Sequence, residues 1–171
     1  MMVGRLDDHL RDLAKEQGLS VNPELLTWAG IAVGKRAYEI FRERGYESKL
    51  LIAALRGNNH IEQFVGGDLV ISMPPSNEQA YGEHVGHKLP APLIDEPVPA
   101  GKIEELGERF LDFRRAYAPD GMTPEEFDSF GPNVKTISQF SQNWEGLIRF
   151  VEDAERDEAK GDEAKGKEAR V

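Results

Sequence analysis

Two short, continuous apolar runs constrain the fold of this chain more than any other feature. Residues 50–55 read Leu-Leu-Ile-Ala-Ala-Leu, and residues 68–73 read Asp-Leu-Val-Ile-Ser-Met. Runs this short, bounded by charged and turn residues, are typical of strands that are buried on both faces in a parallel sheet. Because residues 60–65 between them suit a short helix, the sequence predicts a βαβ unit with a right-handed crossover.

Helices are predicted on both sides of this unit. Apolar residues recur at helical spacing over residues 6–17 and again over residues 22–45, where an Asn-Pro pair supplies an N-cap and a first-turn proline. The same periodicity returns at residues 103–117 and 134–155. The chain is therefore expected to be mostly helical by residue count.

Composition divides the chain into four segments. Residues 1–75 hold the βαβ pattern, and residues 76–101, rich in Pro, Gly and polar residues, are expected to form a long loop. Residues 102–155 are expected to form closing helices, the last of which buries an apolar stripe between positions 134 and 151. In residues 156–171 an Asp-Glu-Ala-Lys-Gly repeat carries no large apolar side chain before the last residue, so we expect a disordered tail or a frayed helix.

The composition excludes several classes of protein. The chain has 171 residues and a net charge of −10, and its 21 basic residues are interspersed with 31 acidic ones, which argues against a nucleic-acid partner. It has no cysteine, so disulfides, thiolate metal sites and cysteine nucleophiles are excluded. No run approaches the roughly 20 apolar residues of a membrane span, and no secretory signal begins the chain. A cytoplasmic protein with no membrane contact is expected.

Arg56 is the most informative polar residue, because it directly follows the first apolar run. Side chains alternate along a strand, so Arg56 continues the face of Ile52 and Ala54 and emerges at the carboxyl end, where ligands bind in α/β folds. Asn58 lies in the segment that opens the next helix, whose backbone N–H groups can face an anion. The alternative is a surface arginine that pairs with an acidic residue.

Other motifs carry weaker signals. The Gly-x-x-x-Gly-Lys run of residues 30–35 has the wrong spacing for a phosphate loop and lies within a helical pattern. Glu83, His84 and His87 could hold a metal, but no further ligand is evident beside them, so a solvated loop is the favoured interpretation and no metal is expected. His60 is expected on a helix surface.

Residues 37–74 resemble the last two strand–helix units of the transaldolases. Residues 53–57 read Ala-Ala-Leu-Arg-Gly where the family has Ala-Ser-Phe-Arg-Asn at the end of its seventh strand. Residues 3–8 read Val-Gly-Arg-Leu-Asp-Asp, similar to the family's segment at the end of strand six. The resemblance implies an α/β fold, a partial (β/α)₈ TIM barrel that runs from the end of strand six to strand eight and is followed by C-terminal helices.

The resemblance also implies a ligand. Transaldolases transfer dihydroxyacetone between sugar phosphates of the pentose phosphate pathway through a lysine Schiff base, with no cofactor. Arg5 and Arg56 match the two family arginines that contact the substrate phosphate, while Ala54 stands where the family has a serine and supplies no hydroxyl. Asn58 completes the expected phosphate-binding set.

The catalytic residues of the family have no counterpart here. Its Schiff-base lysine and its acidic proton-handling residues precede the matched segments, and a complete barrel needs about 250 residues. None of the lysines at positions 35, 49, 88 and 102 is a credible replacement. We therefore expect no turnover from this chain alone. The alternatives are a noncatalytic sugar-phosphate-binding module and an interaction module completed by a second chain that supplies strands one to five.

Overall fold

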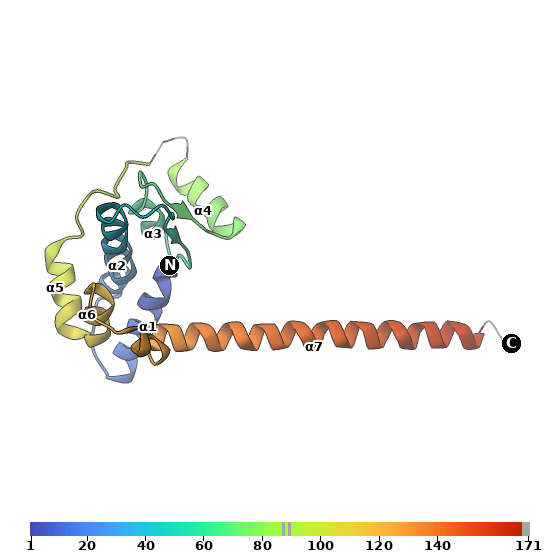
Figure 1. Ribbon diagram of the computed structural model, residues 1–171. Helices are drawn as coiled ribbons and strands as arrows, with labels where there is room; N and C mark the ends of the chain where they lie inside the picture. The colour runs from blue at the N-terminus through green and yellow to red at the C-terminus, as the bar shows by residue number, and fades with distance from the viewer. Residues whose placement is uncertain (87, 89, 169–171) are drawn as a thin grey trace. The chain divides into compact units, whose positions relative to one another are not determined.

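The computed structural model describes residues 1–86, 88 and 90–168, with side chains up to Arg156. The chain forms two units, Met1–Phe127 and Asp128–Val171. Along the sequence the elements are α1 (Val3–Glu16), α2 (Pro23–Glu43), β1 (Leu51–Ile52), α3 (Asn59–Glu62), β2 (Val70–Ile71), α4 (Pro75–Val85), α5 (Ala100–Arg109), α6 (Leu111–Tyr117), the 3₁₀-helix η1 (Pro124–Asp128) and α7 (Gly131–Glu168) (Figure 1).

The expected α/β class and the partial (β/α)₈ barrel are wrong. The described residues form seven α-helices and two strands of two residues each, so the protein is mostly helical. The two strands do pair in parallel, with Leu51 opposite Val70 and Ile52 opposite Ile71. An isolated bridge joins Met2 to Ala53 beside them. This small parallel arrangement is all of the expected sheet that the described residues contain.

The strands are short because the chain leaves the extended conformation soon after each of them. Ala54 has a φ of 59°, a left-handed conformation that turns the chain out of β1. After β2, Pro75 begins α4, and a proline has no N–H to extend a ladder. The apolar run also gave a misleading signal, since Ile52 is buried while Leu51 is 43% exposed. Only one face of the run is covered, whereas a barrel strand is covered on both.

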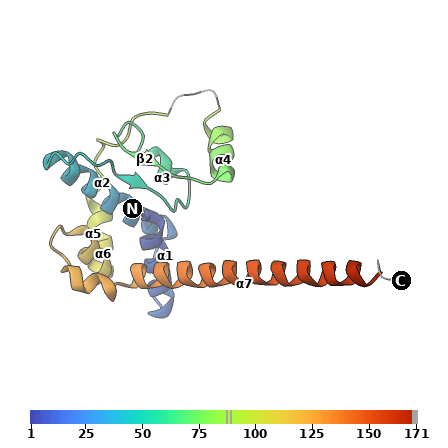
Figure 2. The same ribbon diagram turned by 45° about the vertical axis from the view of Figure 1, so that its right-hand side comes forward.

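The helices of the first unit pack around α2. Its start confirms the sequence prediction, because the side chain of Asn22 accepts a hydrogen bond from the Glu24 N–H (3.0 Å) and a proline follows in the first turn. A Cβ built on Gly30 would lie 2.3 Å from the Val3 carbonyl oxygen. Helices α1 and α2 therefore approach more closely than a residue other than glycine at position 30 would permit. Helices α5 and α6 also contact α2 (Figure 2).

The apolar core of the first unit lies between these helices and the strand pair. Its buried members come from α1, α2, β1, α3 and the segment after α4: Val3, Ile31, Tyr38, Leu50, Ile52, Leu55, Ile61, Phe64 and Ile94. The N–H groups of Leu93 and Ile94 donate to the Val65 carbonyl (3.0 and 3.1 Å), which holds this segment against the core. The core therefore fixes β1 and Leu55, which directly precedes Arg56 in the connection to α3.

The segment expected as a long loop contains a helix. Helix α4 covers Pro75–Val85, with proline in its first turn and Gly86 at its C-cap in a positive-φ conformation. None of its residues is fully buried, which explains why its apolar residues show no periodicity. The remainder of residues 76–101, where described, has no further helix or strand before α5.

The second unit is dominated by α7, which begins at Gly131 and extends to Glu168. Its apolar stripe was expected to be buried, but the side chains are exposed, Ile137 by 62% and Trp144 by 63%. Helical backbone continues through most of the expected tail, and residues 169–171 lie outside the described part. None of the described helices is both long and apolar enough to cross a membrane.

Candidate functional site

The candidate site is a cavity of about 330 Å³ at the end of β1. It is bounded by the connection between β1 and α3 on one side and by α4 on the other. Its lining residues are Leu55, Arg56, Gly57, Asn58, Ile61, Asn77 and Ala80. The cavity lies entirely within the first unit, because all of its lining residues belong to Met1–Phe127.

Arg56 is held in a fixed orientation at this cavity. Its Nε donates to the Asp8 carboxylate (3.0 Å) and its Nη2 to the same carboxylate (2.6 Å), while Nη1 donates to the Ala54 carbonyl (3.1 Å). A bidentate arginine–carboxylate pair of this kind fixes the guanidinium plane. The hydrogen bond to Asp8 raises the pKa of Arg56 against the opposing effect of burial. The side chain is 33% exposed, so a ligand can still reach it.

Asp8 is the acidic centre of a small arginine cluster. Burial alone would raise the pKa of Asp8, but hydrogen bonds and charge from Arg56 and Arg11 outweigh burial and hold that pKa below its usual value. Arg11 donates to Asp8 over 2.9 Å from the same helix. Arg5 precedes Asp8 by three positions on α1, so both residues lie on one face of that helix. Two arginines therefore bind one carboxylate, and a third lies on the same helix face.

A buried polar link lies directly behind Arg56. The backbone N–H of Arg56 donates to Nδ1 of His60 (3.1 Å), so the imidazole proton is on Nε2. That Nε2 donates to the Thr27 carbonyl (3.2 Å) and lies 2.8 Å from the Asp7 carboxylate. The other oxygen of Asp7 accepts from the Gly30 N–H (2.8 Å). Through this link α1, α2 and α3 together position the backbone at Arg56.

Sequence reasoning missed both members of this link. His60, expected on a helix surface, is completely buried, and so is Asp7. Asp7 did carry a signal, because it falls between Val3 and Leu10 at the helical spacing of the buried stripe of α1. A carboxylate on an apolar stripe needs a buried partner.

The four residues predicted to bind phosphate are only partly brought together. Arg56 and Asn58 line the cavity, whereas Arg5 and Ala54 do not. The bridge between Met2 and Ala53 places the start of α1 beside the end of β1, so Arg5 lies near the site. Ala54 contributes its carbonyl to Arg56 and its positive φ to the turn. A residue other than glycine with a positive φ is strained by about 1–3 kcal/mol, and residues of this kind are often found at functional sites.

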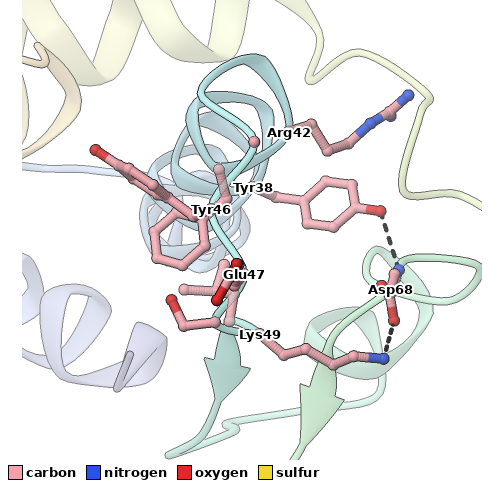
Figure 3. Close-up of a pocket in the computed structure, with 10 residues that line it drawn as sticks. Tyr38, Arg42, Tyr46, Glu47, Lys49 and Asp68 are labelled. Carbon is pink, nitrogen blue, oxygen red and sulfur yellow. Dashed lines mark hydrogen bonds and ion pairs between the residues drawn. The ribbon is translucent and has the colours of Figure 1, made fainter.

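A second cavity, of about 160 Å³, lies at the other end of β1 (Figure 3). Lys49 forms an ion pair with Asp68, whose N–H donates to the Tyr38 hydroxyl (2.9 Å). The guanidinium of Arg42 lies 5.6 Å from the centre of the Tyr38 ring. Within this cavity Lys49 and Asp68 bind each other and fasten the start of β2, while Arg42 pairs with Asp95 outside it (2.6 Å).

The weaker motifs have structural explanations. The glycine-rich run lies inside α2, and its Lys35 donates to the carbonyls of Leu93 and Glu96 (2.6 and 2.7 Å). Burial lowers the pKa of Lys35, and the nearby Glu96 carboxylate partly opposes this effect. His84 pairs with Glu62 (3.1 Å), while His87 lies outside the described residues. Among the residues that the structure describes, no three His, Asp or Glu side chains are placed to hold a metal ion.

The arrangement at Arg56 matches the alternative that the sequence left open, an arginine paired with an acidic residue, here at the wall of a cavity. It combines a guanidinium fixed by Asp8, two asparagines and a cavity, and the described lining residues include no lysine, histidine or carboxylate that could act as a nucleophile or a general base. No family model, curated protein or solved structure matches this chain, so the resemblance to the transaldolases stays a prediction carried by the residues alone.

Proposed function

We propose that this chain binds a small phosphorylated sugar in the cavity beside Arg56 and does not transform it. The observation that carries the proposal is the guanidinium of Arg56, oriented by Asp8 and lining a cavity of about 330 Å³ together with Asn58 and Asn77. This volume is near the lower limit of small-molecule sites, roughly 300–1,000 Å³. A phosphate with a short sugar fits such a space.

The donors around the cavity suit a phosphate group. Arginine has five N–H groups. Asp8 takes the N–H of Nε and one N–H of Nη2, and backbone carbonyls take those of Nη1, which leaves the second N–H of Nη2 for a ligand. The backbone N–H groups of Gly57 and Asn58 donate to no acceptor within the described part of the chain. These groups lie at the cavity wall and offer hydrogen bonds that a phosphate oxygen accepts.

The absence of reactive groups among the described residues at the cavity favours binding over catalysis. A Schiff-base enzyme needs a lysine in a desolvated pocket with a nearby proton acceptor. Lys35 is the one buried lysine among the described residues, and its amine is engaged by the carbonyls of Leu93 and Glu96, away from this cavity. The sugar-phosphate-binding alternative is therefore preferred to an active transferase.

Replacing Arg56 by alanine is expected to weaken binding of fructose 6-phosphate by about 10- to 150-fold, because one charge-assisted contact contributes roughly 1.5–3 kcal/mol. Isothermal titration calorimetry measures this, with unphosphorylated fructose as the ligand control. Arg11→Ala is the matched protein control, since Arg11 also binds Asp8 but does not line the cavity. Equal affinity of the wild-type and R56A proteins for fructose 6-phosphate would refute the proposal.

A second candidate function is docking of a further polypeptide on the strand pair. Leu51 and Val70 are opposite each other and are 43% and 46% exposed, so one face of the pair is open. Among the described residues β2 pairs with β1 alone, which leaves the Ile71 N–H on an unpaired edge.

This second candidate predicts strong protection of one amide. On mixing with a polypeptide that adds an extended segment to β2, hydrogen exchange at Ile71 should slow by about tenfold or more. The Gly86 amide, which closes α4, is the internal control. Unchanged exchange at Ile71 in a mixture that co-purifies would show that the contact is elsewhere.

A further inference from the structure

The long helix α7 presents an apolar stripe that no described residue covers. Six positions between Ile137 and Ala154 form it, and four of its large side chains are more than half exposed: Ile137 (62%), Phe140 (58%), Trp144 (63%) and Leu147 (52%). Isolated single apolar residues on a surface are normal, but a continuous stripe of this kind marks an interaction site. This feature is independent of the phosphate site.

The spacing of the stripe is that of a coiled coil. Its residues follow each other at intervals of three and four: Ile137, Phe140, Trp144, Leu147, Val151 and Ala154. These are the a and d positions of a heptad repeat, which form the seam along which one helix packs against another. A helix of this kind gains most of its stability from the element that covers its seam. The spacing therefore indicates a second helix as the occupant.

The charges beside the stripe argue against a membrane surface as the occupant. Between residues 135 and 156 the helix carries three basic and four acidic side chains. Helices that lie on anionic lipid are rich in lysine and arginine on their polar face. An excess of acidic side chains is repelled by such a surface, so a protein helix is the better partner.

We infer that α7 pairs with α7 of a second copy of this chain in an antiparallel coiled coil. In that orientation Trp144 packs against Leu147 of the second copy, Phe140 against Val151, and Ile137 against Ala154. Each layer then joins a larger side chain to a smaller one, as close packing requires. A parallel pair would stack Trp144 on Trp144 and Phe140 on Phe140.

The charged side chains beside the stripe do not oppose this orientation. In the same repeat Lys135, Glu152 and Asp153 occupy f, b and c positions, which face away from the seam, and Glu155 occupies an e position that flanks it.

The buried area fits a dimer of moderate affinity. A large apolar or aromatic side chain buries roughly 150–250 Å² when fully covered. The large side chains of the stripe are about half exposed now. Covering these five side chains removes about 400–600 Å² per copy, compared with about 800 Å² per partner in a stable complex. The dimer should therefore dissociate on dilution.

Sedimentation equilibrium of the full chain tests the association. We expect a concentration-dependent dimer of the 19.1 kDa chain, and a monomer for Leu147→Glu, which places a charge in the seam. Gln142→Glu, at an exposed position away from the seam, is the matched control and should leave the dimer intact. A wild-type protein that stays monomeric would overturn the inference. The same holds if Trp144 of a monomer is protected from fluorescence quenchers, because the stripe would then be covered by its own chain.

Disulfide trapping tests the orientation, because the natural chain has no cysteine. Ile137→Cys and Ala154→Cys proteins are oxidised separately and as a mixture. An antiparallel pair gives a cross-linked heterodimer in the mixture and little product from either protein alone, whereas a parallel pair gives efficient homodimers from each. Efficient cross-linking of Ile137→Cys alone would reject the antiparallel arrangement. Neither result bears on phosphate binding, so the two proposals fail separately.

Discussion

Replacing Asp7 by alanine is expected to lower the free energy of unfolding of the first unit by about 2–5 kcal/mol, because it removes the acceptor of the buried Gly30 N–H and the carboxylate that lies against His60. The Gly30 N–H donates to one oxygen of Asp7 over 2.8 Å, and Nε2 of His60 lies 2.8 Å from the other. The side chains of Asp7 and His60 are completely buried, so water cannot replace the carboxylate. Urea unfolding followed by far-ultraviolet circular dichroism measures the loss.

A graded series separates the chemistry of Asp7 from its volume. Asp7→Asn keeps an oxygen for the Gly30 N–H but places an amide N–H₂ beside the protonated Nε2 of His60, so an intermediate loss of about 1–3 kcal/mol is expected. Glu16→Ala, at an exposed position of the same helix, is the control and should change stability by less than about 0.5 kcal/mol. If Asp7→Ala behaves like Glu16→Ala, the buried link does not support the fold.

The same substitution should disturb the proposed phosphate site. His60 accepts a hydrogen bond from the Arg56 backbone, so a change at Asp7 reaches the cavity through a single imidazole. The buried link thus explains how a site that rests on two-residue strands stays ordered. In larger α/β proteins a wide sheet holds the catalytic loops, whereas here α1, α2 and α3 hold Arg56 by side-chain hydrogen bonds.

Helices α1 and α2 could be predicted from the sequence because their signals are local, whereas α4, which buries no residue, was missed. The N-cap of Asn22, the proline that follows it and the apolar periodicity of α1 and α2 act within a few residues. The parallel pairing of β1 with β2 also follows from a connection long enough to hold a short helix between the two runs. Local signals of this kind determine the element and much of its position.

The layout of the sheet could not be predicted, because burial depends on what lies opposite. Residues 50–55 have the composition of a strand covered on both faces, yet Leu51 is exposed because no described element covers that face. The apolar stripe of α7 poses the same problem, since Trp144 looks like a core residue in the sequence and is exposed in the structure. The transaldolase resemblance reinforced the wrong expectation by implying a barrel sheet that the described residues do not form.

The candidate site was predictable only in part. The rule that ligands bind at the carboxyl end of a strand selected Arg56, and the N–H groups of the helix that follows selected Asn58. Asp8, which fixes the guanidinium of Arg56, could not be found in this way because it lies 48 residues earlier in the chain. Pairings across such a separation depend on the packing of α1 beside β1.

The close approach of α1 and α2 leads to the second large effect. Replacing Gly30 by alanine is expected to destabilise the first unit by about 3 kcal/mol or more, since overpacking against a rigid neighbour forces backbone shifts. The added Cβ would lie 2.3 Å from the carbonyl oxygen of Val3 and 2.7 Å from its carbonyl carbon, and backbone atoms cannot rotate away. Helix α1 must move, which weakens the bond from Gly30 to Asp7.

Gly82→Ala is the matched control for this substitution. Gly82 lies in α4, and a Cβ added there would meet no other atom within 4 Å, so alanine should stabilise the protein by about 0.5–1 kcal/mol through helix propensity. Thermal or urea unfolding of both variants gives the comparison. The same substitution is then expected to lower the free energy of unfolding at Gly30 and to raise it at Gly82. This difference separates the effect of the steric contact from that of helix propensity. If Gly30→Ala stabilised the protein, α1 and α2 would be able to separate at little cost in free energy. The close contact between α1 and α2 would then not be what places Asp7, Asp8 and Arg56.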